Sequence, residues 1–515
     1  MKMQLYSLEI NIENNWYPVE NGKTPFFPDV NVTLENSVLT LTAGETPVRA
    51  LRVHWENIVP AEADVLGDMW ERGYGDLHWK KRSETGVLPW YFLAAWNGSV
   101  SAFGVKTQPN AMCWWACDDT GVTLTADTTS GRKGVRLLGR TLPLAEIVFA
   151  EYTGDAFDAA VSFCKMMCPS PRLPAQPVYG GNDWYCNYGE NSYESIVEHT
   201  RKIVGCAKEN KNRPFMVIDD GWQLCHHNGT NDAEYFNGGP WRYCSRRFGD
   251  MKKLAEEITA MGAKPGIWFR PLWTTEELPK EYILKYETTK YTLDPSVPAV
   301  LEMIKEDVAT IRSWGYKLIK HDFTSYDIFA KWGMDSDRYL GMPVDFADDT
   351  RTTAEIVLAL YRAIREAAGD DILIIGCNTF SHLSAGLFEL QRTGDDTSGR
   401  EWERTRKMGV NTLAFRAPHH GAFYAADADC VGITGQVDWE KNKQWLDVLA
   451  KSGTPLFVSI ADNGCFTKEV ETAVTAAFQK ACEPHAVSRP MDWMTTKTPR
   501  VWQSDFGTDT YNWND

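Results

Sequence analysis

Eight strand-like runs recur between Val178 and Ile460, and most of them are followed by a helix-like stretch. The runs are Tyr179–Trp184, Phe215–Asp220, Ala263–Arg270, Lys317–Asp322, Asp371–Cys377, Leu387–Asp396, Thr412–Ala417 and Thr454–Ile460. Nearly continuous apolar strands that alternate with helices indicate a parallel sheet covered on both faces. Eight repeats predict an α/β fold of the closed (β/α)8 type, the TIM barrel, in which the carboxyl ends of the strands carry the chemistry.

The chain ahead of these runs has a different pattern. Short alternating runs, such as residues 30–43, 90–106 and 122–129, are broken by Gly, Asn and Pro. Period-two alternation predicts an antiparallel β-sandwich, and the Pro-dense residues 169–177 mark a linker. We therefore expect three parts, which are an N-terminal β-sandwich (1–170), a catalytic (β/α)8 barrel (171–484) and a short C-terminal β region (485–515), either minimal or truncated.

Composition narrows the ligand class. The net charge of -16 argues against a nucleic-acid partner, because phosphate binding needs a basic surface. The 21 Trp residues fit either a β-rich core or a carbohydrate ligand, since an indole face packs against the C–H face of a sugar. No apolar run is long enough to span a membrane, and the amino terminus lacks a secretory signal. We expect a cytoplasmic protein with reduced thiols, although a mature secreted chain would look the same.

Metal and cofactor sites are not expected. The spacings in Cys113–Cys117 and Cys164–Cys168 are not CxxC, and the pairs His226-His227 and His419-His420 are adjacent, which points their side chains to opposite faces of a strand. A metal-dependent hydrolase that uses the His pairs stays an alternative, and it would lose activity to chelators.

Carboxylates at the predicted strand ends are the candidates for chemistry. Glycoside hydrolysis with retention needs two carboxylates about 5–5.5 Å apart, one to attack the anomeric carbon and one to protonate the leaving oxygen. The candidates are Asp219, Asp220, Asp322, Asp395 and Asp396, with Asp427 and Asp429 in a later loop. Each could instead cap a helix or a turn.

Local spacing suggests what these carboxylates do. Lys320 precedes Asp322 by two residues, so both side chains point the same way on a strand, and an ammonium group favours an ionised nucleophile. The adjacent charges of Asp395 and Asp396 would raise one pKa, as a general acid requires. Asp219 and Asp220 could accept hydrogen bonds from two neighbouring sugar hydroxyls. Trp184 and Trp222 could supply a stacking floor.

Three motifs carry a resemblance to a known group. VIDDGWQ (217–223), the IKHD that ends at Asp322 and RTGDD (392–396) resemble signatures of clan D glycoside hydrolases, the α-galactosidases and α-N-acetylgalactosaminidases of families 27 and 36. A sandwich ahead of the barrel is similar to the bacterial family 36 layout. The resemblance implies a retaining exo-α-glycosidase, an α-galactosidase that releases terminal α-linked galactose from a small oligosaccharide or glycoside. It implies no cofactor, no membrane partner, and a homo-oligomer by analogy.

The resemblance also implies roles for individual residues. Asp322 would be the nucleophile and Asp395 the general acid/base. Asp219 and Asp220 would bind O4 and O6 of galactose, and Trp184 would line the pocket. Lys320 would hold ring hydroxyls, and Arg392 would lie on the O2 side.

Four positions depart from the family pattern. Arg270-Pro271 stands where family 36 has Glu-Pro, and His321 stands where Trp or Tyr usually precedes the nucleophile. Arg392 lies three residues before Asp395 instead of four, and Cys377-Asn378 matches neither the 2-hydroxyl nor the 2-acetamido pattern. Arg270 could instead accept a carboxylate or sulfate on the substrate. The alternatives are therefore an α-N-acetylgalactosaminidase, or a glycan-binding barrel without catalysis.

Overall fold

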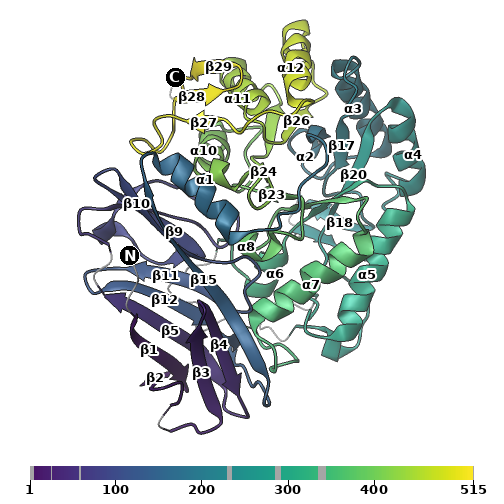
Figure 1. Cartoon of the computed structure of the whole chain (residues 1–515). Coiled ribbons are helices and arrows are strands. Elements are labelled where there is room, and N and C mark those ends of the chain that lie inside the picture. Colours follow the sequence, from purple (N-terminus) through teal and green to yellow (C-terminus); the bar gives the residue numbers. More distant parts are fainter. Residues whose placement is uncertain are drawn as a thin grey trace.

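The computed structural model describes residues 5–24, 26–56, 59–228, 235–284, 291–333 and 344–513. Two antiparallel sheets make up the N-terminal part, shown in purple and blue in Figure 1. The six-stranded sheet contains β2 (Asn15–Pro18), β1 (Leu5–Ile12), β5 (Val48–Glu56), β12 (Gly121–Asp127), β11 (Met112–Cys117) and β8 (Leu88–Pro89), in that order. The seven-stranded sheet contains β3 (Val30–Glu35), β4 (Val38–Ala43), β15 (Thr141–Thr153), β10 (Ser99–Val105), β9 (Tyr91–Trp96), β6 (Asp64–Gly67) and β7 (Lys80–Lys81).

The alternating sequence pattern explains these antiparallel sheets. Along β4 every second side chain is buried, so one face of the strand packs inward and the other meets solvent. The three alternating runs singled out above form the β3–β4 hairpin, the β9–β10 hairpin and β12, as predicted. Helix α1 (Ala156–Met167) follows β15 and begins at Asp155, whose carboxylate accepts hydrogen bonds from the first-turn N–H groups.

The second part is built on a single parallel sheet. Its strands, in spatial order, are β24 (Ala425–Asp427), β23 (Leu390–Arg392), β22 (Leu373–Gly376), β21 (Leu318–His321), β20 (Lys264–Phe269), β17 (Phe215–Ile218), β16 (Tyr179–Asn182), β26 (Leu456–Ile460) and β25 (Cys430–Ile433). The first and last strands of this order are separated in the chain only by Ala428 and Asp429. The two edge strands of the sheet are therefore consecutive in the chain, and the sheet curls so that its two edges approach each other.

Helices surround this sheet (Figure 1). The longer ones are α3 (Tyr193–Cys206), α4 (Met251–Met261), α5 (Pro298–Ser313), α7 (Thr353–Ala368), α11 (Trp439–Lys451) and α12 (Lys468–Ala481). Five of them begin at a residue whose side chain accepts a backbone N–H at the helix start, and those residues are Ser192, Asp250, Thr352, Asp438 and Thr467. The alternation of strands and helices follows the sequence prediction.

Two of the eight predicted strands are corrected. Thr412–Ala417 is not a strand, because Thr412–Arg416 forms helix α10 with all five residues buried. A short apolar run cannot distinguish a buried strand from a buried helix, and the strand segment at this point of the sheet is Ala425–Ile433 instead. Of Leu387–Asp396, only Leu390–Arg392 pairs as a strand, so Asp395 and Asp396 lie in the following loop.

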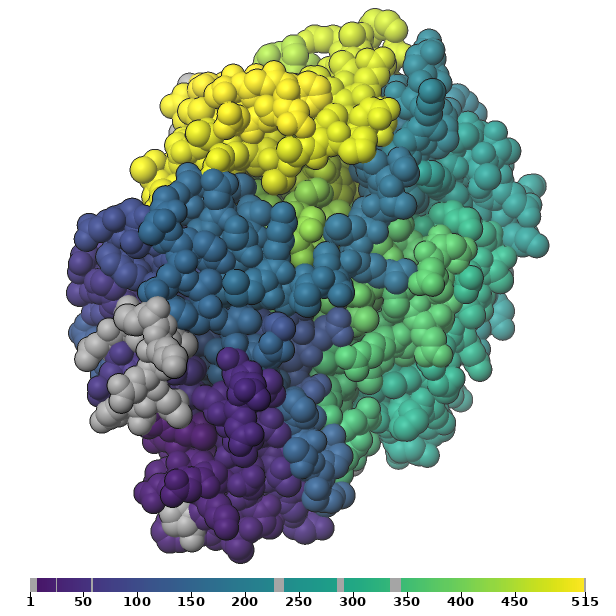
Figure 2. Space-filling model, in the orientation of Figure 1, coloured from purple at the N-terminus to yellow at the C-terminus, as the bar shows by residue number. Residues whose placement is uncertain are grey.

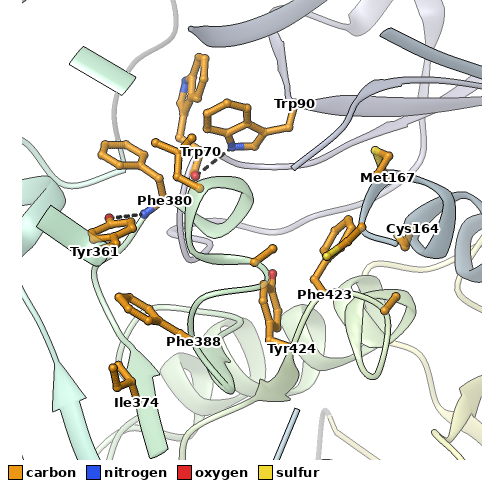
Figure 3. Packing of buried hydrophobic residues seen from close by; sticks show 14 of the residues in the cluster. Trp70, Trp90, Cys164, Met167, Tyr361, Ile374, Phe380, Phe388, Phe423 and Tyr424 are labelled. Carbon is orange, nitrogen blue, oxygen red and sulfur yellow. Dashed lines mark hydrogen bonds between the residues drawn. The ribbon is translucent and has the colours of Figure 1, made fainter. Parts of the chain in front are cut away.

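The sandwich and the parallel sheet share one apolar core. Trp90 of the sandwich stacks on His382 at 5.2 Å between ring centroids, and its Nε1 donates to the carbonyl of Trp70 at 3.0 Å. Figure 3 shows these two tryptophans beside Phe380, Phe423 and other aromatic side chains of the second part. Trp70, Trp90 and His382 are all buried. Their contact therefore holds the segment between β6 and β7 of the sandwich against the part of the chain that contains the parallel sheet.

A three-stranded antiparallel sheet ends the described chain. It consists of β27 (Arg489–Pro490), β28 (Val501–Ser504) and β29 (Gly507–Thr510). Arg489 forms ion pairs with Asp155 and Asp158 at the start of α1, so the C-terminal region, in yellow, lies across both other parts (Figure 2). Within the described residues, no helix is long and apolar enough to cross a membrane.

Candidate functional site

Five of the predicted carboxylates converge on one cavity of about 400 Å³. It lies at the carboxyl ends of β17, β20, β21 and β23, where the chain leaves the sheet. Its lining consists of Asp219, Asp220, Asp322, Asp395 and Asp396, the cations Arg72, Lys320 and Arg404, and the aromatic residues Tyr74, Trp184, Trp268, Phe323 and Trp332. The structure therefore brings together carboxylates from three strand ends, as parallel strands should.

Asp322 is held by two N–H donors. Trp268 Nε1 donates to Asp322 Oδ2 at 2.9 Å, and the amide of Phe323 donates to Asp322 Oδ1 at 2.8 Å. Phe323 has a φ of +64°, a backbone conformation that a bulky residue rarely adopts. This conformation places its amide on the carboxylate, so the orientation of Asp322 is fixed before any ligand arrives.

Lys320 lines the same cavity as Asp322, but its ion pair is with Asp219. The distance from Lys320 Nζ to Asp219 Oδ2 is 2.7 Å, and both side chains are buried. Burial raises the pKa of Asp219, and the adjacent ammonium opposes part of that rise. The spacing argument thus gave the correct face for Lys320, but its ion-pair partner is Asp219, because the fold places the end of β17 within reach of β21 with only β20 between them.

Asp220 is fixed by side chains from its own loop and from the next hairpin. Gln223 Nε2 donates to Oδ1 at 2.6 Å, Asn237 Nδ2 donates to Oδ2 at 3.0 Å, and His226 Nδ1 lies 3.2 Å from Oδ1. The His226-His227 pair therefore supplies a carboxylate contact through its first member, and the side chain of His227 lies outside the described residues. Within the described chain, no group of three His, Cys, Asp or Glu residues is arranged to hold a metal ion.

The adjacent pair Asp395-Asp396 is surrounded by arginines. Asp395 Oδ1 lies 2.8 Å from Arg72 and Asp395 Oδ2 lies 2.6 Å from Arg404. Asp396 Oδ1 lies 3.1 Å from Arg72 and 3.4 Å from Arg392. Burial by itself raises the pKa of Asp396, but the charges of Arg72 and Arg392 more than offset it and leave that pKa below its ordinary value. The one raised pKa that the adjacent charges predict for this pair is therefore not that of Asp396.

Arg72 is a site residue that the sequence reasoning missed. It lies between β6 and β7 in the sandwich, and its segment reaches the parallel sheet through backbone hydrogen bonds. Gly73 N donates to the carbonyl of Thr393 at 2.9 Å, and Asp395 N donates to the carbonyl of Gly73 at 2.7 Å. The sandwich thus completes the cavity and positions the loop that carries Asp395.

No family model matches the sequence. Solved structures match almost the whole chain, however. The alpha-galactosidase TtGalA from Thermus thermophilus, solved with p-nitrophenyl alpha-D-galactopyranoside, is 16% identical with a TM-score of 0.61, and the match covers 99% of each chain. The chain has the fold of the family 36 α-galactosidases.

Two further matches show that this fold does not by itself identify the substrate. The GH36 alpha-galactosidase AgaA from Geobacillus stearothermophilus is 14% identical with a TM-score of 0.59, over 93% of this chain and 75% of that one. A cycloalternan-degrading enzyme from Trueperella pyogenes is 12% identical with a TM-score of 0.54, over 98% of this chain and 86% of that one. Because proteins with different named substrates share the fold, the identity of the sugar depends on the residues of the site.

In this family 36 fold, Arg270 does not reach the cavity. Its guanidinium group pairs with both oxygens of Asp327, with a distance of 3.0 Å from Nε to Oδ2, and it donates to Asn237. The group lies between the rings of Trp273 and Phe323, at 3.9 and 4.1 Å from the ring centroids. Asp327 already neutralises Arg270, so the idea that this arginine binds a carboxylate or sulfate of the substrate loses its basis.

We expect Arg270→Ala to lower the free energy of unfolding by about 3–5 kcal/mol, because it leaves Asp327 charged and buried without its partner. Urea unfolding followed by fluorescence would measure the loss. The matched control is the double variant Arg270→Met with Asp327→Leu, which removes both charges and should recover most of the stability. A loss below about 1 kcal/mol in the single variant would contradict this structural role.

Two other predicted site residues point away from the cavity. His321 is fully buried against Tyr361 and Phe388 on the outer side of β21, and burial lowers its pKa to about 3. Successive residues on a strand face opposite sides, so His321 cannot share the face of Asp322. Trp222 is also fully buried, and its Nε1 donates to the carbonyl of Trp268 at 2.9 Å. Trp222 therefore does not face the cavity, whereas Trp184, the other residue predicted to form a stacking floor, does line it.

Arg392, Cys377 and Asn378 lie directly behind the lining. Arg392 pairs with Asp429 at 2.7 Å as well as with Asp396. Cys377 Sγ lies 3.1 Å from an Arg72 nitrogen, and burial raises the pKa of this thiol. Asn378 Nδ2 donates to the hydroxyl of Tyr74 at 2.5 Å. These residues support Arg72, Tyr74 and Asp396, and they do not themselves line the cavity.

Several aromatic and cationic lining residues were also missed. Trp332 is 42% exposed at the cavity and stacks on Tyr326 with 4.3 Å between ring centroids. Trp268 precedes the end of β20, and Arg404 lies in α9 (Trp402–Thr405). The only signal in the sequence for Trp268 was its place on a predicted strand. Trp332 and Arg404 follow strands by too many residues for a strand-end rule to find them.

Proposed function

We propose that the protein is a retaining exo-α-glycosidase, an α-galactosidase that releases terminal α-linked galactose from a small oligosaccharide or glycoside. The observation that carries the proposal is the convergence of Asp322 and Asp395 on one small cavity with Asp219, Asp220 and Lys320. A pair of carboxylates is what double displacement needs. The named α-galactosidases with the same fold support the choice of sugar.

In the proposed mechanism, Asp322 attacks the anomeric carbon and forms a covalent glycosyl-enzyme. The N–H groups of Trp268 and Phe323 hold its carboxylate in place for that attack. Asp219 and Asp220 accept hydrogen bonds from the O4 and O6 hydroxyls, Lys320 donates to a ring hydroxyl, and Trp184 packs against the sugar. Arg392 acts indirectly, because it holds Asp396 and Asp429 instead of lining the cavity.

Asp395 is the proposed general acid, which gives its proton to the leaving oxygen and later takes one from water. A proton on Asp395 Oδ2 would weaken the contact with Arg404, because a neutral carboxyl oxygen accepts from a guanidinium group less strongly than a carboxylate does. The side chain of Arg404 is 40% exposed, whereas that of Arg72 is 4% exposed. Arg404 is therefore the partner that can move aside.

We also infer that β24 and β25 are two halves of one strand that bends at Ala428 and Asp429. The two halves pair with β23 and β26 respectively, so joining them closes the sheet into eight strands. We also propose the division into a sandwich (1–170), a barrel (171–484) and a C-terminal β region (485–515), because the strands of each sheet fall within one of these three ranges.

The test is a set of initial rates on 4-nitrophenyl glycosides of α-galactose, α-N-acetylgalactosamine, β-L-arabinopyranose and α-glucose. We expect turnover of the α-galactoside, and faster turnover of the 2-acetamido substrate would instead favour an α-N-acetylgalactosaminidase. The two arginine contacts of Asp395 favour one rival, a barrel that binds glycans without catalysis. Galactose binding by calorimetry without turnover of any substrate would support that rival.

A further inference from the structure

The loop that begins at Asp395 leads into three short helical segments that follow one another without a break. Helix α9 carries Arg404, a π-helix spans Arg406–Asn411, and α10 comes next. We call residues 402–416 the Arg404 segment. π-Helices are rare in proteins and are frequently found at functional sites. An unusual backbone therefore directly follows the arginine that pairs with the proposed general acid.

The π-helix packs on the backbone that precedes Asp395. A Cβ atom added to Gly394 would lie 2.0 Å from the carbonyl oxygen of Met408 in the π-helix, so only glycine fits at this position. The hydroxyl oxygens of Thr393 and Thr412 are 2.9 Å apart. The Arg404 segment and the residues before Asp395 are thus packed as one unit.

The C-terminal β region, in yellow in Figure 1, holds the start of α9 through two tryptophans. Trp402 Nε1 donates to the carbonyl of Trp513 at 2.7 Å, and the two rings stack with 6.1 Å between centroids. Trp513 is fixed in turn, because it is 1% exposed and its Nε1 donates to the carbonyl of Pro499 at 2.6 Å. Trp402 lies two residues before Arg404, so this contact fixes the backbone from which the Arg404 side chain extends.

Two further contacts from the C-terminal β region continue along the π-helix. Arg406 Nη1 donates to the hydroxyl of Thr498 at 2.7 Å, and Asn411 Nδ2 donates to the carbonyl of Lys497 at 2.6 Å. Asn411 also exchanges two hydrogen bonds with the backbone of Leu77 in the sandwich, at 2.8 and 2.9 Å. The Arg404 segment is therefore held by the sandwich and by the C-terminal β region at once.

We propose that Trp402 is a positioning residue for the general acid, because its contact with Trp513 sets where the guanidinium group of Arg404 meets Asp395. This inference rests on the proposed function and adds a part in catalysis for the C-terminal β region. The side chain of Arg404 is 40% exposed, so the anchored backbone of α9, and not burial of the side chain, determines which positions its guanidinium group reaches. Without the anchor, Asp395 would lose one of its two orienting arginines, and proton transfer to the leaving oxygen depends on that orientation.

The experiment substitutes Trp402→Phe, which removes the N–H donor and keeps an aromatic ring. We expect kcat/KM on methyl α-galactoside, whose leaving group needs a proton, to fall about 5–10-fold. On 2,4-dinitrophenyl α-galactoside, whose leaving group departs without a proton, the change should be less than about twofold. Arg404→Ala alone should show the same dependence on the leaving group. In the Arg404→Ala background, Trp402→Phe should have no further effect, because it acts through Arg404.

Trp439→Phe is the matched control. Trp439 is the first residue of α11, as Trp402 is the first residue of α9, and both side chains are partly exposed. Its Nε1 also donates a hydrogen bond, to Glu469 at 3.3 Å, but it lies outside the cavity. We expect this variant to keep the wild-type kcat/KM on both substrates.

Three results would overturn the positioning role and leave the proposed function standing. They are an equal loss of kcat/KM on the two substrates in Trp402→Phe, no loss on either, or a loss that persists in the Arg404→Ala background. If the wild-type protein hydrolyses neither substrate, the proposed function fails and this inference fails with it. Thermal unfolding of each variant shows that folded proteins are compared. Thr498→Val, which removes the acceptor of Arg406, should shift the ratio of the two rates in the same direction by a smaller factor, and it decides the question if Trp402→Phe does not fold.

Discussion

Asp322→Asn is expected to lower kcat on 4-nitrophenyl α-galactoside by at least about 1,000-fold, because the covalent route has no other nucleophile at that position. The substitution keeps the shape of the side chain, so the sugar should still bind. Initial rates on the purified variant, together with galactose binding by calorimetry, would separate the two effects. Binding within a few-fold of wild type with this loss of turnover is the expected result.

Asp294→Asn is the matched control for that variant. Asp294 is also buried, and each of its two oxygens also accepts from an N–H group, in this case the backbone N–H of Ser296 at 2.8 Å and that of Ala347 at 2.7 Å. It lies outside the cavity, so its substitution has the same structural cost without the chemical one. We expect both variants to lose stability by similar amounts and only Asp322→Asn to lose activity. Activity of Asp322→Asn above about a tenth of wild type would exclude Asp322 as the nucleophile.

The site residues that could be predicted from the sequence are those at the carboxyl ends of strands. Asp219 and Asp220 follow the buried apolar run Phe215–Ile218, Asp322 follows the buried strand Leu318–His321, and parallel strands bring their carboxyl ends to one edge. Periodicity was enough to find these positions. It failed at Thr412–Arg416, where a buried helix has the same apolar composition as a buried strand.

The rest of the site depends on contacts between distant parts of the chain. Arg72 belongs to the sandwich and meets Asp395 only because the segment between β6 and β7 pairs with the loop after β23. The role of Arg270 was misread for a related reason. Its positive charge was visible in the sequence, but the carboxylate that neutralises it lies in α6 (Thr324–Phe329). A charge in a sequence has no assigned partner until the fold is known.

Asp395→Ala is expected to lower kcat/KM in a way that depends on the leaving group. Methyl α-galactoside has a poor leaving group that needs protonation, so the loss there should be about 10²–10⁴-fold. With 2,4-dinitrophenyl α-galactoside the loss should shrink to a few-fold, because that leaving group departs without a proton. Rates on a series of leaving groups, plotted against the pKa of the released alcohol or phenol, would measure this dependence.

Asp396→Ala is the matched control, because Asp396 is the next residue and shares Arg72 with Asp395. Asp396→Ala removes a negative charge beside Arg72, so a loss caused only by the altered charge around Arg72 should appear in that variant whatever the leaving group. We expect Asp396→Ala to lower the rates by a similar factor on every leaving group. If instead the loss in Asp396→Ala depends steeply on the leaving group and the loss in Asp395→Ala does not, Asp396 is the general acid, and Arg404 serves only to orient Asp395. A uniform loss in both variants would mean that the two carboxylates serve to hold Arg72 in the cavity.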